Sequence, residues 1–138
     1  MKFTKMQGLG NDYLYVWGPP QPGGAAVFSD EGRRQVQKTL DIYKNNAKIM
    51  ADTMERLGLD YTGGRNAPYI WLRCPAPWGS WEFFELLLRE IHVVGTPGAG
   101  FGESGEGWFR FSAFGDPEDT AEAMRRLERL LDRGTGRR

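Results

Sequence analysis

The sequence predicts an α+β fold in which helices cover a small mixed sheet. Three segments carry apolar residues at intervals of three and four, as an amphipathic helix does, and several shorter segments alternate apolar with polar residues, as a strand does. From residue 29 onward the order is helix, strand, helix, strand, strand, helix. This order favours a sheet covered by helices on one side, with the long first helix free to pack elsewhere.

Composition limits both the size and the partners of the chain. Its 138 residues are 40% hydrophobic, enough for one modest core, and 18 basic residues balance 18 acidic ones. A net charge of zero gives no general attraction to nucleic acid or to an anionic membrane. The single cysteine, Cys74, cannot form an internal disulfide, and we find no signal peptide or membrane-spanning run. We therefore expect a cytoplasmic protein.

The first 17 residues are predicted to form a hairpin. Residues 2–6 and 13–17 alternate as strands, and the sequence between them contains Gly8, Gly10, Asn11 and Asp12. Residues 18–24 then combine prolines with glycines, a composition that sustains neither a helix nor a ladder. We interpret this stretch as a linker or seam between the hairpin and a domain at residues 25–133.

A long helix is expected to open that domain. Ser29 is a candidate N-cap, and Gly58 is a candidate C-terminal stop. An apolar stripe runs between them: Val36, Leu40, Tyr43, Ala47, Met50, Met54 and Leu57. We then expect a strand at 68–73, a helix at about 80–91 and a short strand at 92–94.

The final helix is expected to begin beside Asp116, with Pro117 at its first position. Its buried stripe would consist of Ala121, Met124, Leu127 and Leu131. Arginines are frequent in this helix, but acidic residues are interleaved with them, so we interpret them as a solvated face rather than a nucleic-acid patch. Residues 134–138 are expected to form a frayed tail.

Arg110 is the main candidate for a binding residue. Strand alternation puts Trp108, Arg110, Ser112 and Phe114 on one face and Phe109, Phe111 and Ala113 on the other. An unpaired guanidinium removed from water costs on the order of several kcal/mol, whereas its planar fork matches a carboxylate in two parallel hydrogen bonds. A substrate carboxylate would satisfy it. An internal pair with Glu103 or Glu106, or a partly exposed arginine, would do so too, and strand chemistry alone does not decide.

Other candidate features have structural interpretations. Residues 100–105 match the spacing of a dinucleotide-binding glycine motif, but a strand follows them, so no helix N-terminus would meet a phosphate. His92 is interpreted as a structural histidine, Cys74 as a plain thiol and Asn66 as a turn residue. Four tryptophans could form an exposed apolar patch that favours self-association: Trp71, Trp78, Trp81 and Trp108.

From about residue 24 to 131 the sequence resembles the C-terminal small domain of LL-diaminopimelate aminotransferases, enzymes of the class I/II aminotransferase family that use pyridoxal phosphate (PLP). The blocks that carry the resemblance are 63–71 (GGRNAPYIW), 80–84 (SWEFF), 93–98 (VVGTPG) and 110–115 (RFSAFG). The resemblance implies a fold-type I small domain in which Arg110 binds the substrate α-carboxylate. Gly98, Gly100, Gly102 and Glu106 would shape the approach to it.

The same resemblance implies that essential parts lie elsewhere. In this family the lysine that binds PLP belongs to the large domain, upstream of every block matched here. The lysines present are Lys2, Lys5, Lys38, Lys44 and Lys48, and none stands in a comparable motif. We therefore expect this chain alone neither to hold PLP nor to transaminate LL-diaminopimelate. The alternatives are a non-catalytic module that binds the substrate, forms a homodimer or pairs with an aminotransferase chain, and a fusion remnant without function.

Residues 1–13 (MKFTKMQGLGNDY) resemble instead the N-terminus of diaminopimelate epimerases. The resemblance implies a substrate contact for Asn11, although Gln7 stands where histidine is usual. Epimerisation there needs two cysteines, and this chain has only Cys74. Because both resemblances point to one biosynthetic route, to lysine, we infer a gene fusion whose seam spans residues 17–24.

Overall fold

The computed structural model describes residues 2–8, 11–17 and 26–135. It consists of two compact units, residues 1–38 and 39–138, which are described separately here. The proposed seam at 18–24 lies outside the described residues. No helix in the described ranges is both long and apolar enough to cross a bilayer.

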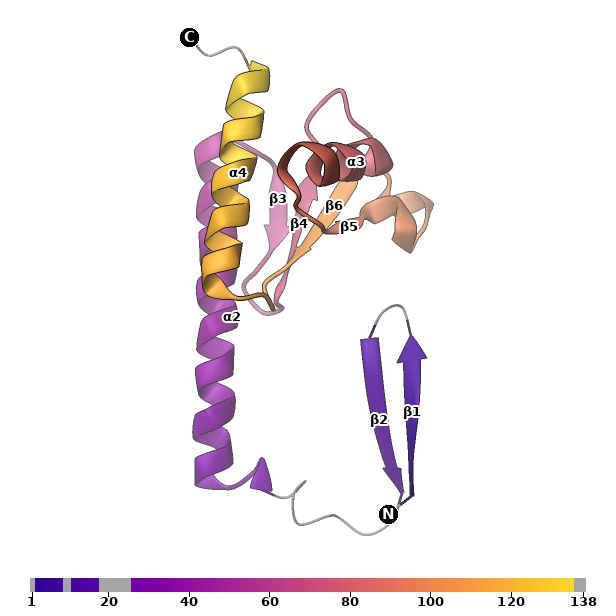
Figure 1. Ribbon diagram of the computed structural model, residues 1–138, viewed down its shortest axis with the longest axis vertical. Helices are drawn as coiled ribbons and strands as arrows, with labels where there is room; N and C mark the ends of the chain where they lie inside the picture. Colours follow the sequence, from indigo (N-terminus) through magenta and orange to yellow (C-terminus); the bar gives the residue numbers. More distant parts are fainter. Residues whose placement is uncertain (1, 9–10, 18–25, 136–138) are drawn as a thin grey trace. The chain divides into compact units, whose positions relative to one another are not determined.

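The N-terminal hairpin is confirmed. Strands β1 (Lys2–Gly8) and β2 (Asn11–Trp17) pair antiparallel, from Lys2 opposite Trp17 to Gly8 opposite Asn11 (Figure 1). Both strands are longer than expected, because pairing continues into the glycine-containing stretch up to the turn. Asn11 is thus the first residue of β2.

The long helix α2 (Asp30–Leu57) begins and ends as the sequence predicts. The Ser29 hydroxyl accepts a hydrogen bond from the Gly32 N–H at 3.0 Å, which caps the first turn. At the other end Gly58 has φ of +66°, the left-handed conformation in which glycine commonly stops a helix.

A four-stranded sheet forms the centre of the second unit. Its order is β3 (Tyr61–Gly63), β4 (Tyr69–Arg73), β6 (Trp108–Ser112) and β5 (Thr96–Pro97). The α+β class is confirmed, but every pairing is antiparallel, whereas a mixed sheet was expected. The reason is topological: β4 and β5 run in the same direction, and β6 inserts between them, so they never pair.

Two strand predictions need correction. Residues 92–94 are not a strand, because His92 adopts φ of +55° and ends helix α3 (Ser80–Ile91) in the left-handed conformation. The strand comes later, as β5, and only two residues long. Strand β3 was not predicted; its three residues are too few to show an alternating pattern.

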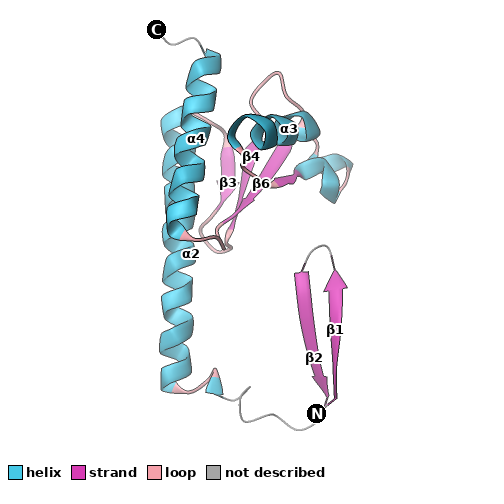
Figure 2. Ribbon diagram, viewed as in Figure 1, coloured by secondary structure: helices cyan, strands magenta, loops and turns pink. Residues whose placement is uncertain are grey.

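Three helices and one face of the sheet form a single core (Figure 2). Ile70 and Leu72 from β4 and Phe109 and Phe111 from β6 supply the sheet side. The helices supply the other buried residues: Ala47, Met50 and Met54 from α2, Phe83 and Leu87 from α3, and Met124, Leu127 and Leu131 from α4 (Pro117–Thr135).

The expectation that the first helix packs elsewhere is therefore wrong for its C-terminal half. Helix α4 runs alongside that half in Figure 1, and the Arg56 Nε donates to a Glu128 carboxylate oxygen at 2.8 Å between them. Earlier along the predicted stripe, Val36 and Leu40 remain about 40% exposed (43% and 42%). Helix α4 also continues through Thr135, beyond the expected start of the frayed tail.

Asn46 joins α2 to the end of β6. Its side chain is fully buried, and its Nδ2 donates to the carbonyls of Ala113 (3.1 Å) and Gly115 (2.8 Å). These carbonyls belong to the corner between β6 and α4, beyond the last residue of the strand, where the sheet offers no N–H groups to both of them. One amide thus fixes the corner at which the strand carrying Arg110 ends.

We predict that Asn46→Ala lowers the free energy of unfolding by about 2 kcal/mol, because two inward-facing carbonyls lose their donor. The adjacent, exposed Asn45 provides the matched control. Asn45→Ala should change stability by less than about 0.5 kcal/mol, since alanine favours the helix. Urea titration of both variants measures the difference, and equal stabilities would contradict the role given to Asn46.

Candidate functional site

Strand β6 presents its side chains to two different environments. Phe109 and Phe111 are 0% and 4% exposed in the core, while Trp108, Arg110 and Ser112 face the opposite way. The predicted alternation is confirmed. In the β4 pairing, Arg110 lies opposite Trp71 and Ser112 opposite Tyr69. The residues facing away from the core define the open face of the sheet: Tyr69, Trp71, Arg73, Trp108, Arg110 and Ser112.

Aromatic rings surround the Arg110 guanidinium. Its central carbon lies 4.5 Å from the ring centroid of Tyr69, 4.5 Å from that of Phe101 and 6.0 Å from that of Trp71. A cation over aromatic faces gains electrostatic stabilisation without using its N–H donors. Sequence reasoning did not assign Tyr69 or Phe101 to this site. Alternation does put Tyr69 on the same face of its strand as Trp71, but no local pattern pairs that strand with the one that carries Arg110.

The Arg110 side chain has an unsatisfied hydrogen-bond donor. Its Nε is buried and has no hydrogen-bond partner. Neither Glu103 nor Glu106 pairs with it; among the described residues Arg110 takes part in no ion pair. Of the three arrangements that the sequence left open, the structure thus lacks the internal ion pair.

Glu106 instead links the glycine-rich turn, residues 98–107, to the start of α3. Its carboxylate accepts a hydrogen bond from the Ser80 N–H at 2.9 Å, where a negative charge is favourable at the start of a helix. The Ser80 hydroxyl accepts from the Gly107 N–H at 2.9 Å and lies 2.9 Å from the Trp108 carbonyl oxygen. These contacts fix the turn just before β6 begins.

The glycines of this turn differ in what they permit. The turn contains two short 3-10 segments, η1 (Gly98–Phe101) and η2 (Glu103–Gly105). Gly98 and Gly105 pack backbone to backbone, and a Cβ on either would collide with the other's carbonyl oxygen. Gly102 has φ of +117°, which strains any other residue, whereas a Cβ on Gly100 would meet no atom within 4 Å.

The remaining predicted residues lie away from Arg110 or lack reactive features. Asn11 belongs to the other compact unit. Cys74 is buried, and burial together with the Glu106 carboxylate raises the pKa of its thiol to about 11, so it stays protonated near neutral pH. No three His, Cys, Asp or Glu side chains among the described residues gather into a metal site.

Comparison with known proteins identifies the family. Residues 4–127 match the family model of class I and class II aminotransferases, and the chain belongs to this family. It is similar to two LL-diaminopimelate aminotransferases, from Azobacteroides pseudotrichonymphae (52% identity over 112 residues) and Parabacteroides distasonis (52% over 111 residues). These matches cover 81% and 80% of this chain but only 28% and 27% of the relatives.

Solved structures agree with this assignment. The LL-diaminopimelate aminotransferase of Chlamydomonas reinhardtii superposes with a TM-score of 0.74 at 40% identity, over 78% of this chain and 26% of that one. An aromatic aminotransferase from Pyrococcus horikoshii gives 0.75 at 30% identity, over 81% and 30%. The chain therefore spans little more than a quarter of the relatives that it matches. The family match begins at residue 4 and so includes most of the N-terminal hairpin.

The lysines on α2 do not suit the cofactor of this family. A lysine that forms a Schiff base needs a shielded setting that lowers its pKa. Lys38, Lys44 and Lys48 are all exposed on α2, and Lys48 pairs with Asp52 at 2.5 Å. We therefore assign no step of PLP chemistry to these three lysines.

The close contact of Gly98 with Gly105 provides a test of the turn. We predict that Gly105→Ala lowers the free energy of unfolding by about 2 kcal/mol, because the new methyl group meets rigid backbone rather than a side chain that can move. Gly100→Ala, in the same turn, should stay within about 0.5 kcal/mol of the parent protein. Thermal or urea unfolding distinguishes the two, and a destabilised Gly100→Ala with an unaffected Gly105→Ala would refute the packing described.

Proposed function

We propose that this chain is the part of an LL-diaminopimelate aminotransferase that recognises the substrate α-carboxylate, and that Arg110 binds it. The observation that carries the proposal is the Arg110 side chain, whose buried Nε has no partner and whose guanidinium lies against aromatic rings. The relatives named LL-diaminopimelate aminotransferase, each about 52% identical, supply the substrate class.

The chemistry of the open face suits a carboxylate. Ring faces shield the guanidinium from bulk water, which strengthens any charge-assisted hydrogen bond that it makes. The ring contacts leave its N–H groups available, so a carboxylate can bind through two parallel hydrogen bonds. No internal carboxylate has to be displaced first. Gly98, Gly100, Gly102 and Glu106 would contribute indirectly, by fixing the turn before β6.

Amino-group transfer requires more than this face. PLP, when bound, supplies the electron sink of the reaction, and the lysines on α2 are too exposed to suit it. We therefore propose that the chain does not transaminate by itself, and that the remainder of the enzyme comes from a further segment or another chain.

A second candidate function is that of an interaction module, either in a homodimer or with another aminotransferase chain. The observation that favours it is exposed apolar surface on the second unit: Val94 is 69% exposed, Trp81 57% and Phe101 46%. Phe101 borders the Arg110 site, so a partner covering it would also close that site. Sedimentation of the chain alone and mixed with an intact aminotransferase distinguishes self-association from pairing.

The origin of residues 1–16 also remains a proposal. We infer that they derive from a diaminopimelate epimerase gene joined to an aminotransferase gene. Genomic sequence tests this idea directly: epimerase and aminotransferase genes adjacent in related genomes would support it, and an unrelated neighbourhood would contradict it.

Carboxylate binding by Arg110 is tested by calorimetric titration of the chain with LL-diaminopimelate. Arg110→Lys keeps the charge but loses the fork, so we predict that its affinity falls at least about tenfold. Arg73 lies on the same open face, exposed, with its guanidinium carbon 5.4 Å from the Trp108 ring centroid. Arg73→Lys is therefore the matched control and should bind as the parent protein does.

Two results would contradict the proposal. Equal affinity of the parent protein and Arg110→Lys would remove Arg110 from recognition. Glutamate formed from LL-diaminopimelate and 2-oxoglutarate by the chain with added PLP, above the level of the buffer alone, would show that it transaminates unaided.

A further inference from the structure

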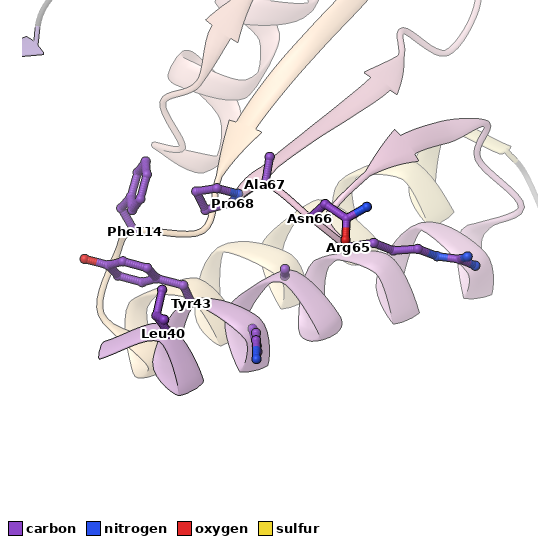
Figure 3. Close-up of a pocket in the computed structure, with 10 residues that line it drawn as sticks. Leu40, Tyr43, Arg65, Asn66, Ala67, Pro68 and Phe114 are labelled. Atoms are coloured by element: carbon purple, nitrogen blue, oxygen red, sulfur yellow. The ribbon is translucent and has the colours of Figure 1, made fainter. Parts of the chain in front are cut away.

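A hollow lies between α2 and the loop that joins β3 to β4. In Figure 3, Leu40 and Tyr43 on the helix face Ala67 and Pro68 of the loop, and Phe114 stands at one end. Arg65 and Asn66 stand at the other end. Ten residues line this hollow, called here the helix–loop pocket: Leu40, Tyr43, Lys44, Ala47, Gly64, Arg65, Asn66, Ala67, Pro68 and Phe114.

The helix–loop pocket has room for one ring and its surface is mostly apolar. Its volume is about 210 Å³, whereas a dry protein cavity of about 150 Å³ already accepts benzene. At the Phe114 end the Tyr43 and Phe114 rings meet edge to face, with centroids 4.9 Å apart. A flat aromatic group would extend this arrangement of rings.

The charges of the helix–loop pocket have one sign. Lys44 and Arg65 are its only ionisable lining residues apart from Tyr43, and no acidic side chain lines it. Neither cation belongs to an ion pair formed within residues 26–132, although Lys48, one turn along α2, pairs with Asp52. Asn66 adds an amide that can donate further hydrogen bonds. An apolar interior bordered by unpaired cations is complementary to a small amphipathic anion.

We propose that the helix–loop pocket binds a small aromatic carboxylate, with its ring packed against the Tyr43–Phe114 pair and its carboxylate toward Lys44, Arg65 and Asn66. The pocket shares no lining residue with the Arg110 site, so the proposal does not rest on the function proposed above, although Phe114 contacts Tyr69 beside Arg110. It is a second anion site on the chain, with its own ligand class.

The test uses 3-phenylpropionate as the probe and follows backbone amide shifts of the whole chain by NMR. A ligand of this size, bound to an open pocket, should have a dissociation constant on the order of a millimolar. We expect saturable shifts at residues 64–67 and 114, and an affinity about tenfold lower for the neutral analogue 3-phenylpropionamide. Arg110→Lys should leave these shifts unchanged, which separates them from binding at the open face.

Two variants probe the parts of the pocket. The double variant Lys44→Gln/Arg65→Gln should weaken binding about tenfold, as expected for two solvent-accessible charges. Its control, Arg89→Gln/Arg125→Gln, removes two cations from exposed ion pairs on α3 and α4 and should bind as the parent does. Ala67→Phe places a ring in the hollow and should abolish binding without removing a core contact, because Ala67 is exposed.

Three results of the NMR titration would contradict this assignment of the ligand to the helix–loop pocket. Equal binding of the acid and the amide would mean a purely apolar hollow and would overturn the proposal. Absence of shifts at 10 times the expected dissociation constant would do the same. Loss of the shifts in Arg110→Lys, with the helix–loop pocket intact, would assign the anion to the open face instead.

Discussion

The alternation of side chains along β6 is the constraint on which the rest of the second unit depends. Phe109 and Phe111 fill the core, and their burial determines which face of the strand meets solvent. A shift of one residue in the pairing of β6 would exchange the two faces. It would bury a guanidinium and expose two phenylalanines. The energy that holds the core together therefore also holds Arg110 among its aromatic neighbours.

Two buried polar side chains fix the strand at its ends. Ser80, at the start of α3, holds the glycine-rich turn before β6, and Asn46, on α2, holds the corner after it. Both are fully buried, and each bonds backbone groups that no ladder satisfies. Such residues add direction to a core that is otherwise apolar, because hydrogen bonds require one geometry and apolar packing tolerates several. The Arg110 strand is thus held at both of its ends by helices that precede it in the chain.

Sequence reasoning succeeded where a repeating pattern coincided with burial. Both caps of α2, the buried positions Met124, Leu127 and Leu131 of α4, and the alternation of β6 were predicted correctly. It failed where the outcome depended on contacts distant in sequence. Strand β5 is only two residues long and exists because β6 offers it a partner, and α2 packs in the core because α4 lies beside it. The Tyr69 and Phe101 contacts with Arg110 likewise join three segments whose proximity no local pattern reveals.

A row of rings runs from α2 to the guanidinium. The ring centroids of Tyr43 and Phe114 lie 4.9 Å apart, and those of Phe114 and Tyr69 lie 5.6 Å apart. The Tyr69 centroid in turn lies 4.5 Å from the guanidinium carbon of Arg110. A rotation or slide of this part of α2 would therefore reorient the cation through successive edge contacts. No ion pair takes part in these ring contacts, so salt screens them little. Mechanical coupling between the helix and Arg110 would accordingly survive changes of ionic strength that disable couplings built from ion pairs.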